Sequence, residues 1–301
     1  MTGSTPHEGG TAAAATITEL YTYPVKGCAG TPLRTAAVTP AGLAHDRTFM
    51  VTAEDGAFRS QRRDPRLARV RPSVDGDGAV LTLRADGFGE VAVAVSAGPD
   101  APRRPVTLFG TPYPGIDQGA EAAAWLSEVL GAPSRLVRVP PEHDRVTDGE
   151  TAGTSGYADS AAVHLVSAAS LDALNARIEE GGERPVPMDR FRPNIVVDGW
   201  PDGAGLPAAH AEDRVRRLAA GTALLGYAKP AIRCAVTRTD QVTGARSGLE
   251  PLRTLAAYRR EPEGGVSFGV KFAVLRPGRL AVGDAARAIA WTEDGAPLPG
   301  R

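Results

Sequence analysis

The sequence has only two cysteines, Cys28 and Cys234, in 301 residues. They do not form a C-x-x-C pair, which excludes a disulfide framework, a zinc ribbon and a cysteine-ligated iron–sulfur cluster. No histidine has a second histidine three to five positions away, so no local histidine metal site is indicated. Gly-x-Ser-x-Gly, the P-loop and a strand-following Gly-x-Gly-x-x-Gly are also missing, which argues against hydrolase, nucleotide-kinase and dinucleotide-binding classes.

Lysine is scarce as well, since Lys26, Lys229 and Lys271 stand beside 31 arginines. The 34 basic and 35 acidic residues give a net charge of −1, which does not favour binding to nucleic acid or an anionic membrane. No run reaches the roughly 20 apolar residues that cross a bilayer, and the first fifteen residues lack the basic start and apolar run of a signal peptide. We therefore expect a cytoplasmic protein, a monomer without nucleic-acid or membrane partners.

Short apolar stretches separated by turn residues predict a β-rich first unit at residues 16–140, after a flexible leader at residues 1–15. Strands are expected at residues 16–28, 33–38, 48–52, 58–61, 80–83 and 91–95, with turns at 54–56 and 86–87. Their spacing favours a barrel or a curled sheet. Apolar residues at helical spacing from Ala122 to Leu130 predict one helix, which Gly131 ends.

Residues 140–156 are polar, and we expect a linker or mobile loop there. The second unit, residues 141–292, is predicted to be mixed and β-rich, followed by a tail at 293–301. Strands are expected at residues 162–166, 194–197, 223–225, 234–239, 268–275 and 287–291, and helices from about Leu171 to Gly181 and at 252–259. The predicted class is α+β, with two β-barrel-type units and peripheral helices.

Two short segments carry candidate ligands for an anion or a metal. Cys234 follows Arg233 at the start of a predicted strand, where the guanidinium would favour a thiolate suited to a soft metal. The alternative is a buried structural cysteine. Lys26 precedes Gly27 on a turn, where the ammonium could bind a phosphate or remain solvated.

Two further segments place polar residues ahead of strands. Arg47 follows Asp46, and its guanidinium could fork onto a phosphate or form a structural ion pair between loops. Arg192 and Asn194 alternate along a predicted strand, so their side chains should share a face and could grip one polar ligand. A solvated strand edge is the alternative interpretation.

Seven segments occur in a characteristic order along the chain: YPVKGC, HDRTFMV, YADSAAVHLVSAASLDALN, FRPNIVV, KPAIRCAVTRTD, PLRTLAAYR and FGVKFAV. Together they resemble the MOSC family, in which an N-terminal β-barrel domain precedes the MOSC domain. The resemblance extends from about Thr16 to Trp291.

This resemblance implies that the chain binds the molybdenum cofactor, a pyranopterin dithiolene with a terminal phosphate. It implies that Cys234 is the molybdenum ligand and catalytic residue. The expected cofactor contacts are Lys26, Gly27, Arg47, Asp159, Ser160, Arg192, Asn194, Arg233 and Lys271. The expected activity is that of an oxidoreductase that reduces N-hydroxylated compounds by oxygen transfer to molybdenum, with electrons from a separate flavin or ferredoxin-type donor.

Four residues, in three of these motifs, depart from the family pattern. Gly27 stands where many relatives have serine, Ala231-Ile232 replaces Cys-Ser ahead of Arg233-Cys234, and Lys271 stands where tyrosine is common. These changes imply altered contacts to cofactor or substrate, and Lys26 and Lys271 are expected to face the same pocket.

Two alternative functions come from other classes. One is a non-catalytic carrier of the cofactor or of sulfur, and the other is a metal-free enzyme of the same fold that acts on a metabolite. A sulfurase that uses pyridoxal phosphate needs an aminotransferase-like domain, whose pattern this sequence does not show.

Overall fold

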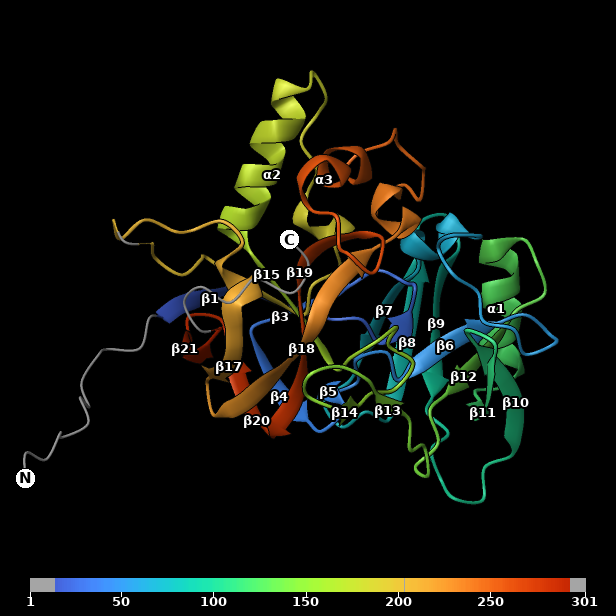
Figure 1. Ribbon diagram of the computed structural model, residues 1–301. Helices are drawn as coiled ribbons and strands as arrows, with labels where there is room; N and C mark the ends of the chain where they lie inside the picture. Colours follow the sequence, from blue (N-terminus) through green and yellow to red (C-terminus); the bar gives the residue numbers. More distant parts are fainter. Residues whose placement is uncertain (1–13, 203, 293–301) are drawn as a thin grey trace, which may run out of the picture.

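The computed structural model describes residues 14–202 and 204–292 (Figure 1). Within them, seven strands form a closed barrel, because β16 pairs with both β15 and β1. The strands of this sheet, in spatial order, are β16 (Ile195–Val197), β15 (Val163–Ser167), β19 (Val266–Arg276), β18 (Ala223–Arg233), β17 (Val215–Ala220), β21 (Ala285–Trp291), β1 (Ala14–Thr22) and, outside the closed ring, β3 (Thr31–Leu33).

Strand β1 shows how the sequence builds the barrel wall. Ala15 and Ile17 are buried at alternate positions, and after a register shift between Ile17 and Glu19 the next inward side chain is Leu20. Such a shift is typical of a β-bulge, which bends a strand where a sheet must close. Inside the barrel these side chains meet Trp200 and Phe272, both fully buried.

Two helices cover one end of the barrel (Figure 1). Helix α2 (Ala168–Glu180) connects β15 to its parallel neighbour β16, as a parallel pair requires a long crossover. Leu174 and Ile178 of α2 pack with Leu255 of α3 (Leu252–Tyr258) and with Phe268. Among the described residues, no helix combines the length and the apolar character that crossing a bilayer demands.

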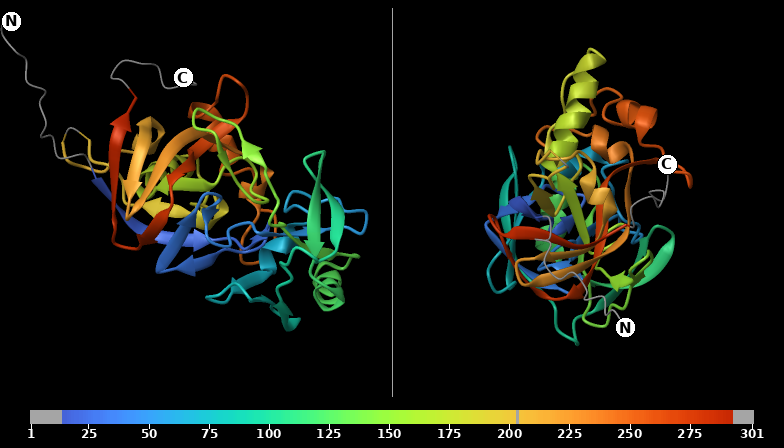
Figure 2. Two further views of the ribbon diagram at one scale, coloured as in Figure 1. Left: turned by 90° about the horizontal axis from the view of Figure 1, so that it is seen from below. Right: turned by 60° about the vertical axis from the view of Figure 1, so that its left-hand side comes forward.

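A second lobe lies beside the barrel (Figure 2). Its five-stranded sheet has the order β10 (Arg103–Leu108), β11 (Thr111–Asp117), β12 (Arg135–Arg138), β6 (Phe49–Thr52) and β2 (Val25–Lys26). A three-stranded sheet of β7 (Arg71–Val74), β8 (Val80–Ala85) and β9 (Gly89–Ala94) packs with it around a shared core. Helix α1 (Ala120–Leu130) supplies Leu126 and Leu130 to this core.

The remaining elements are short. Strands β4 (Thr35–Thr39), β5 (Gly42–Leu43) and β20 (Gly278–Ala281) form a small sheet, and β13 (Val146–Thr147) pairs with β14 (Gly153–Thr154). Single 3₁₀ turns are η1 (Pro65–Arg69), η2 (Met188–Arg190), η3 (Ala211–Arg214) and η4 (Ala235–Arg238).

The predicted α+β, barrel-rich class is confirmed, since three helices accompany these sheets in the described residues. The predicted helix ends at Gly131, which adopts a left-handed φ of 62° and donates its amide to the carbonyl of Glu128. The hairpin on either side of residues 86–87 is present as β8 and β9. Both predicted helices of the second unit also form, as α2 and α3.

The strand predicted at residues 234–239 is wrong. Strand β18 ends at Arg233, and the chain turns at Cys234 into η4. The Thr237 backbone amide and hydroxyl both donate to the Cys234 carbonyl, at 3.1 and 2.9 Å. These local hydrogen bonds replace the hydrogen bonds to a neighbouring strand that a strand would need. Cys234 therefore lies at the end of a strand and not at the beginning of one.

The linker predicted at residues 140–156 is held in place by backbone hydrogen bonds. It contains the β13–β14 pair, and the amides of Glu150 and Thr151 donate to the carbonyls of Ala228 and Tyr227 at 2.8 and 3.0 Å. The last two bonds tie residues 150–151 to β18. Its polar composition does not make it mobile, because the backbone itself provides the pairing.

Two other expectations differ from the structure. The strand predicted at residues 58–61 is reduced to a single bridge between Thr52 and Phe58. The boundary near residue 140 stays a prediction, and strands from before it also join the barrel side of the molecule, since β1 pairs with β16 and β21 and β4 pairs with β20. The predicted leader lies outside the described residues except for Ala14 and Ala15, which begin β1, and the predicted tail lies outside from residue 293 on.

Candidate functional site

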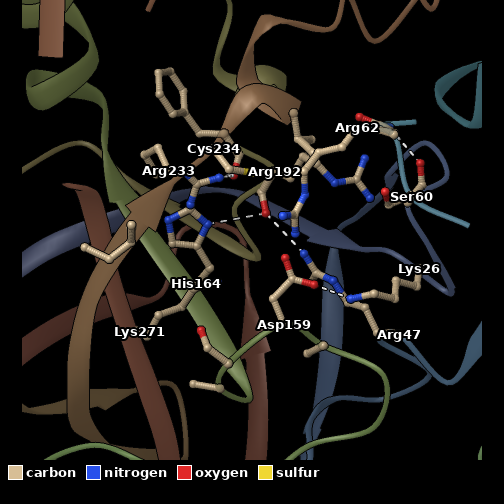
Figure 3. Close-up of a pocket in the computed structure, with 18 of the residues that line it drawn as sticks. Lys26, Arg47, Ser60, Arg62, Asp159, His164, Arg192, Arg233, Cys234 and Lys271 are labelled. Atoms are coloured by element: carbon tan, nitrogen blue, oxygen red, sulfur yellow. Dashed lines mark hydrogen bonds and ion pairs between the residues drawn. The ribbon is translucent and has the colours of Figure 1, made fainter. Parts of the chain in front are cut away.

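A single pocket contains all ten residues named from the sequence. It opens where the ends of barrel strands meet loops of the second lobe (Figure 3). Its lining includes Lys26, Gly27, Arg47, Asp159, Ser160, Arg192, Asn194, Arg233, Cys234 and Lys271. Residues from Lys26 to Lys271 converge here because the barrel brings β15, β16, β18 and β19 together beside β2 and β6.

Lys26 is buried on the wall that the second lobe contributes. Its ammonium donates to the carbonyl of Tyr157 at 2.9 Å and to the carboxylate of Asp159. Burial lowers the pKa of Lys26, although Asp159 opposes this shift. Enclosure alone would raise the pKa of Asp159, but attraction to Lys26 outweighs it, and the net shift is downward. Asp159 is therefore ionised near neutral pH, and its carboxylate favours the charged form of Lys26. The next residue, Gly27, has φ = 80°, a conformation that a side chain would strain.

Arg47 and Arg192 share the ring of Tyr23, with guanidinium carbons 4.2 and 4.3 Å from its centroid. Arg47 is held by Asp46 at 2.5 Å and by the amide oxygen of Asn194 at 3.1 Å. Asn194 also accepts from the His164 amide and donates to the Tyr21 carbonyl. Its amide therefore orients Arg47. Arg192 and Asn194 both line the pocket, and their joint contact with one ligand stays a prediction.

Cys234 is half-buried and lines the pocket, whereas Cys28 is fully buried outside it. Burial raises the pKa of Cys28 to about 12, which makes that thiol inert. Arg233, beside Cys234, donates to the Phe191 carbonyl at 2.9 Å, but its buried Nε has no partner within the described residues. Burial lowers the pKa of Arg233 to about 10. The pocket thus offers one accessible thiol next to a guanidinium with hydrogen-bonding capacity to spare.

Lys271 and His164 lie side by side on neighbouring strands, since they are directly paired between β15 and β19. Burial, then repulsion from Arg233 and Arg47, lowers the pKa of Lys271 to about 7. Burial and the nearby Lys271 keep the pKa of His164 well below its ordinary value, so His164 is neutral. Its ring nitrogens lie 3.4 and 3.3 Å from the carbonyls of Arg192 and Phe268. Figure 3 shows His164 and Lys271 across the pocket from Lys26 and Arg47.

The charges of the lining are strongly unbalanced. Seven cationic side chains line the pocket, and Asp159 is the one carboxylate among the lining residues. The cationic residues are Lys26, Arg47, Arg59, Arg62, Arg192, Arg233 and Lys271. Lys26, Arg47 and Arg59 are paired with Asp159, Asp46 and Asp64, whereas no carboxylate of the described residues forms an ion pair with the other four. Because buried charge without a partner is costly, these four cations are suited to an anion that supplies negative charge.

Sequence reasoning missed a loop that completes the pocket. Arg59, Ser60, Gln61 and Arg62 line it, although a strand was predicted there. Gln61 donates to the Gly27 carbonyl at 2.6 Å and exchanges amide hydrogen bonds with Gln241 at 3.1 Å. The arginines grouped around Ser60 are the feature of the sequence that could have indicated this loop, because a strand prediction gives no reason for them.

The chemistry of the lining fits the molybdenum cofactor in two respects. The cationic surplus and the unpartnered Arg233 Nε suit an anionic group such as a phosphate. The thiol of Cys234 is a soft ligand suited to a metal that sulfur already holds. The described residues contain no cluster of three or more His, Cys, Asp or Glu side chains that could hold a bare metal ion.

The fold and the pocket agree with comparisons to known families. Residues 14–133 match the MOSC N-terminal beta barrel domain, and residues 152–287 match the MOSC domain. The chain therefore belongs to the family of proteins in which these two domains follow one another.

Its curated relatives include amidoxime-reducing components. The chain is 31% identical to "Mitochondrial amidoxime-reducing component 1" of Mus musculus over 288 residues, covering 89% of this chain and 81% of the relative. The Homo sapiens protein of the same name is 31% identical over 287 residues, with the same shares covered. "Molybdenum cofactor sulfurase" of Danio rerio is 31% identical over 276 residues, which are 86% of this chain and 32% of that relative.

Proposed function

We propose that this protein holds the molybdenum cofactor in the pocket and reduces N-hydroxylated compounds such as amidoximes. The observation that carries the proposal is one accessible thiol, Cys234, in a pocket with seven cations and one carboxylate. Similarity to amidoxime-reducing components supports the substrate class. When bound, the cofactor supplies the two-electron redox chemistry that breaks the N–O bond.

The residues of this chain then have distinct tasks. Cys234 provides a sulfur ligand, and the guanidinium groups of Arg192 and Arg233 neutralise the anionic part of the cofactor. Arg47, oriented by Asp46 and Asn194, adds a third guanidinium. Lys271 can hold or release a proton at Nζ near neutral pH, because its pKa is about 7.

The overall reaction needs two electrons and two protons from outside the substrate. Cleavage of the N–O bond in R–NH–OH gives R–NH₂ and one water. A separate flavin or ferredoxin-type protein is the proposed source of the electrons.

Metal and pterin content tests the first half of the proposal. The wild type, Cys234→Ala and the control Cys28→Ala should be purified from cells that synthesise the cofactor. We expect about one molybdenum and one pterin per chain in wild type and Cys28→Ala, and a marked loss or an altered metal spectrum in Cys234→Ala. A wild type without either component contradicts the proposal and favours metal-free chemistry on a metabolite.

Turnover tests the second half. Benzamidoxime reduction with reduced methyl viologen should proceed in the loaded wild type and stop in Cys234→Ala. Molybdenum without turnover would favour a non-catalytic cofactor carrier, the second candidate, which the similarity to "Molybdenum cofactor sulfurase" supports.

A further inference from the structure

Two chain segments, residues 59–71 and 238–249, meet beside the mouth of the pocket, and we name their common face the arginine surface. The guanidinium of Arg246 donates to the Arg62 carbonyl. Gly244 packs so closely that a Cβ there would lie 3.1 Å from the Pro65 carbonyl oxygen. With the Gln61–Gln241 pair, these contacts make the two segments one continuous face. Figure 1 shows them next to each other, in cyan and orange.

The arginine surface is strongly basic in a protein that is acidic elsewhere. Its two segments hold eight arginines and two aspartates, so the rest of the chain has 26 basic and 33 acidic residues. Asp64 is already paired with Arg59 at 3.5 Å, and Asp240 with Arg190 at 3.3 Å. The side chains of Arg62, Arg63, Arg66 and Arg246 are exposed. The face therefore presents positive charge to solvent.

Large apolar side chains are exposed on and beside the same face. Val242 and Leu249 of the second segment are 66% and 55% exposed. Ile232, which lines the pocket mouth, is 50% exposed. Phe109 is 46% exposed, and its ring lies 5.8 Å from the Arg62 guanidinium. Single exposed apolar residues are ordinary, but arginines grouped with apolar and aromatic side chains are typical of protein interfaces.

We propose that the arginine surface docks an acidic electron-donor protein at the mouth of the pocket. This inference rests on the proposed function, which draws two electrons from outside the chain. Arg62 belongs to both the surface and the pocket lining, so a protein docked here reaches the site directly. The exposed aliphatic residues favour a protein partner over nucleic acid, because a phosphate backbone offers them no apolar contact.

The electron balance fixes how often such a donor must dock. A ferredoxin-type protein carries one electron, so two reduced ferredoxins are oxidised for each N–O bond broken. Two protons from solvent complete the amine and the water. The surface must therefore release its partner between two visits, as charge-steered, moderate-affinity contacts allow.

Binding to the loaded protein can be measured with a plant-type [2Fe–2S] ferredoxin, an acidic one-electron carrier, as the probe. Arg63→Glu/Arg246→Glu changes one exposed arginine in each segment. The matched control, Arg217→Glu/Arg287→Glu, changes two exposed arginines of β17 and β21 on the barrel and alters the net charge equally. At low salt we expect the first variant to bind ferredoxin about tenfold or more weakly and the control to change less than about twofold.

Val242→Ser tests the apolar part of the surface. It should weaken ferredoxin binding about threefold at both low and high salt, because the contact that it removes is apolar.

Three results would overturn the proposal: no ferredoxin binding by the wild type, equal losses in the two double variants, or equally tight binding of a DNA duplex with the same sensitivity to Arg63→Glu/Arg246→Glu. A second measurement, of turnover rates, separates this inference from the proposed function. Turnover driven by ferredoxin should fall in Arg63→Glu/Arg246→Glu, while turnover driven by reduced methyl viologen stays at the wild-type rate. A wild type that binds ferredoxin at this surface but shows no viologen-driven turnover would refute the proposed reaction and support the docking surface.

Discussion

Lys271 offers the sharpest test of the electrostatics of the pocket. Its ammonium is enclosed near Arg233 and Arg47, and its pKa falls from the ordinary 10.5 to about 7. Replacing it with methionine removes the charge and keeps a long side chain. We expect Lys271→Met to stabilise the cofactor-free protein, because binding sites commonly retain unfavourable charges that a ligand compensates.

The expected gain follows from the pKa. Each tenfold change in proton affinity is worth about 1.4 kcal/mol, so holding the ammonium in the fold costs at most about 5 kcal/mol. Because the side chain reaches solvent through the pocket, we expect a gain of about 1–3 kcal/mol. The unfolded chain binds more protons than the folded one between about pH 7 and 10.5, so wild-type stability rises with pH across that window. The gain from Lys271→Met should therefore be largest below pH 7 and about 1–2 kcal/mol smaller near pH 9.

Urea unfolding of cofactor-free protein near pH 6 and pH 9 measures this difference. Lys229→Met is the matched control, because Lys229 lies next to Lys271 in the sheet but outside the pocket, where it pairs with Asp148. A gain that is equal at the two pH values, or larger near pH 9, would refute the argument. The control should show no comparable dependence on pH.

Three further variants test individual contacts. Lys26→Met should raise the pKa of Asp159 toward its ordinary value, because the strongest attraction is lost while those to Lys271 and Arg47 remain, and an NMR titration of the carboxyl carbon that shows no rise would contradict this. Gly131→Ala should cost about 1 kcal/mol in urea unfolding, because its φ of 62° favours glycine. Asp46→Asn should loosen Arg47 and reduce pterin content several-fold in protein made with the cofactor, whereas full occupancy would show that Arg47 is held well enough by Asn194.

Local signals in the sequence were sufficient for several elements. The α1 helix ends where glycine can adopt a left-handed φ, and the β8–β9 hairpin turns at residues rich in turn propensity. Local signals failed at Thr237, where hydrogen bonds to the nearby Cys234 carbonyl replace those between strands. They also failed at Glu150, where a strand distant in the sequence holds a polar segment in place. In both cases the hydrogen-bond partners of the backbone cannot be predicted from the residues adjacent in the sequence.

By itself, the sequence determined the family, the residue types and the order in which they occur, because motifs such as YPVKGC and KPAIRCAVTRTD are local. Only the tertiary structure decided that Lys26, Asp159 and Cys234 share one pocket, since this depends on barrel closure between Ile17 and Val197. It alone decided which thiol is accessible and why the pKa of Lys271 is about 7, because burial and repulsion depend on distance in space. The arginine surface likewise exists because the Arg246 guanidinium donates a hydrogen bond to the carbonyl of Arg62, 184 residues away in the chain.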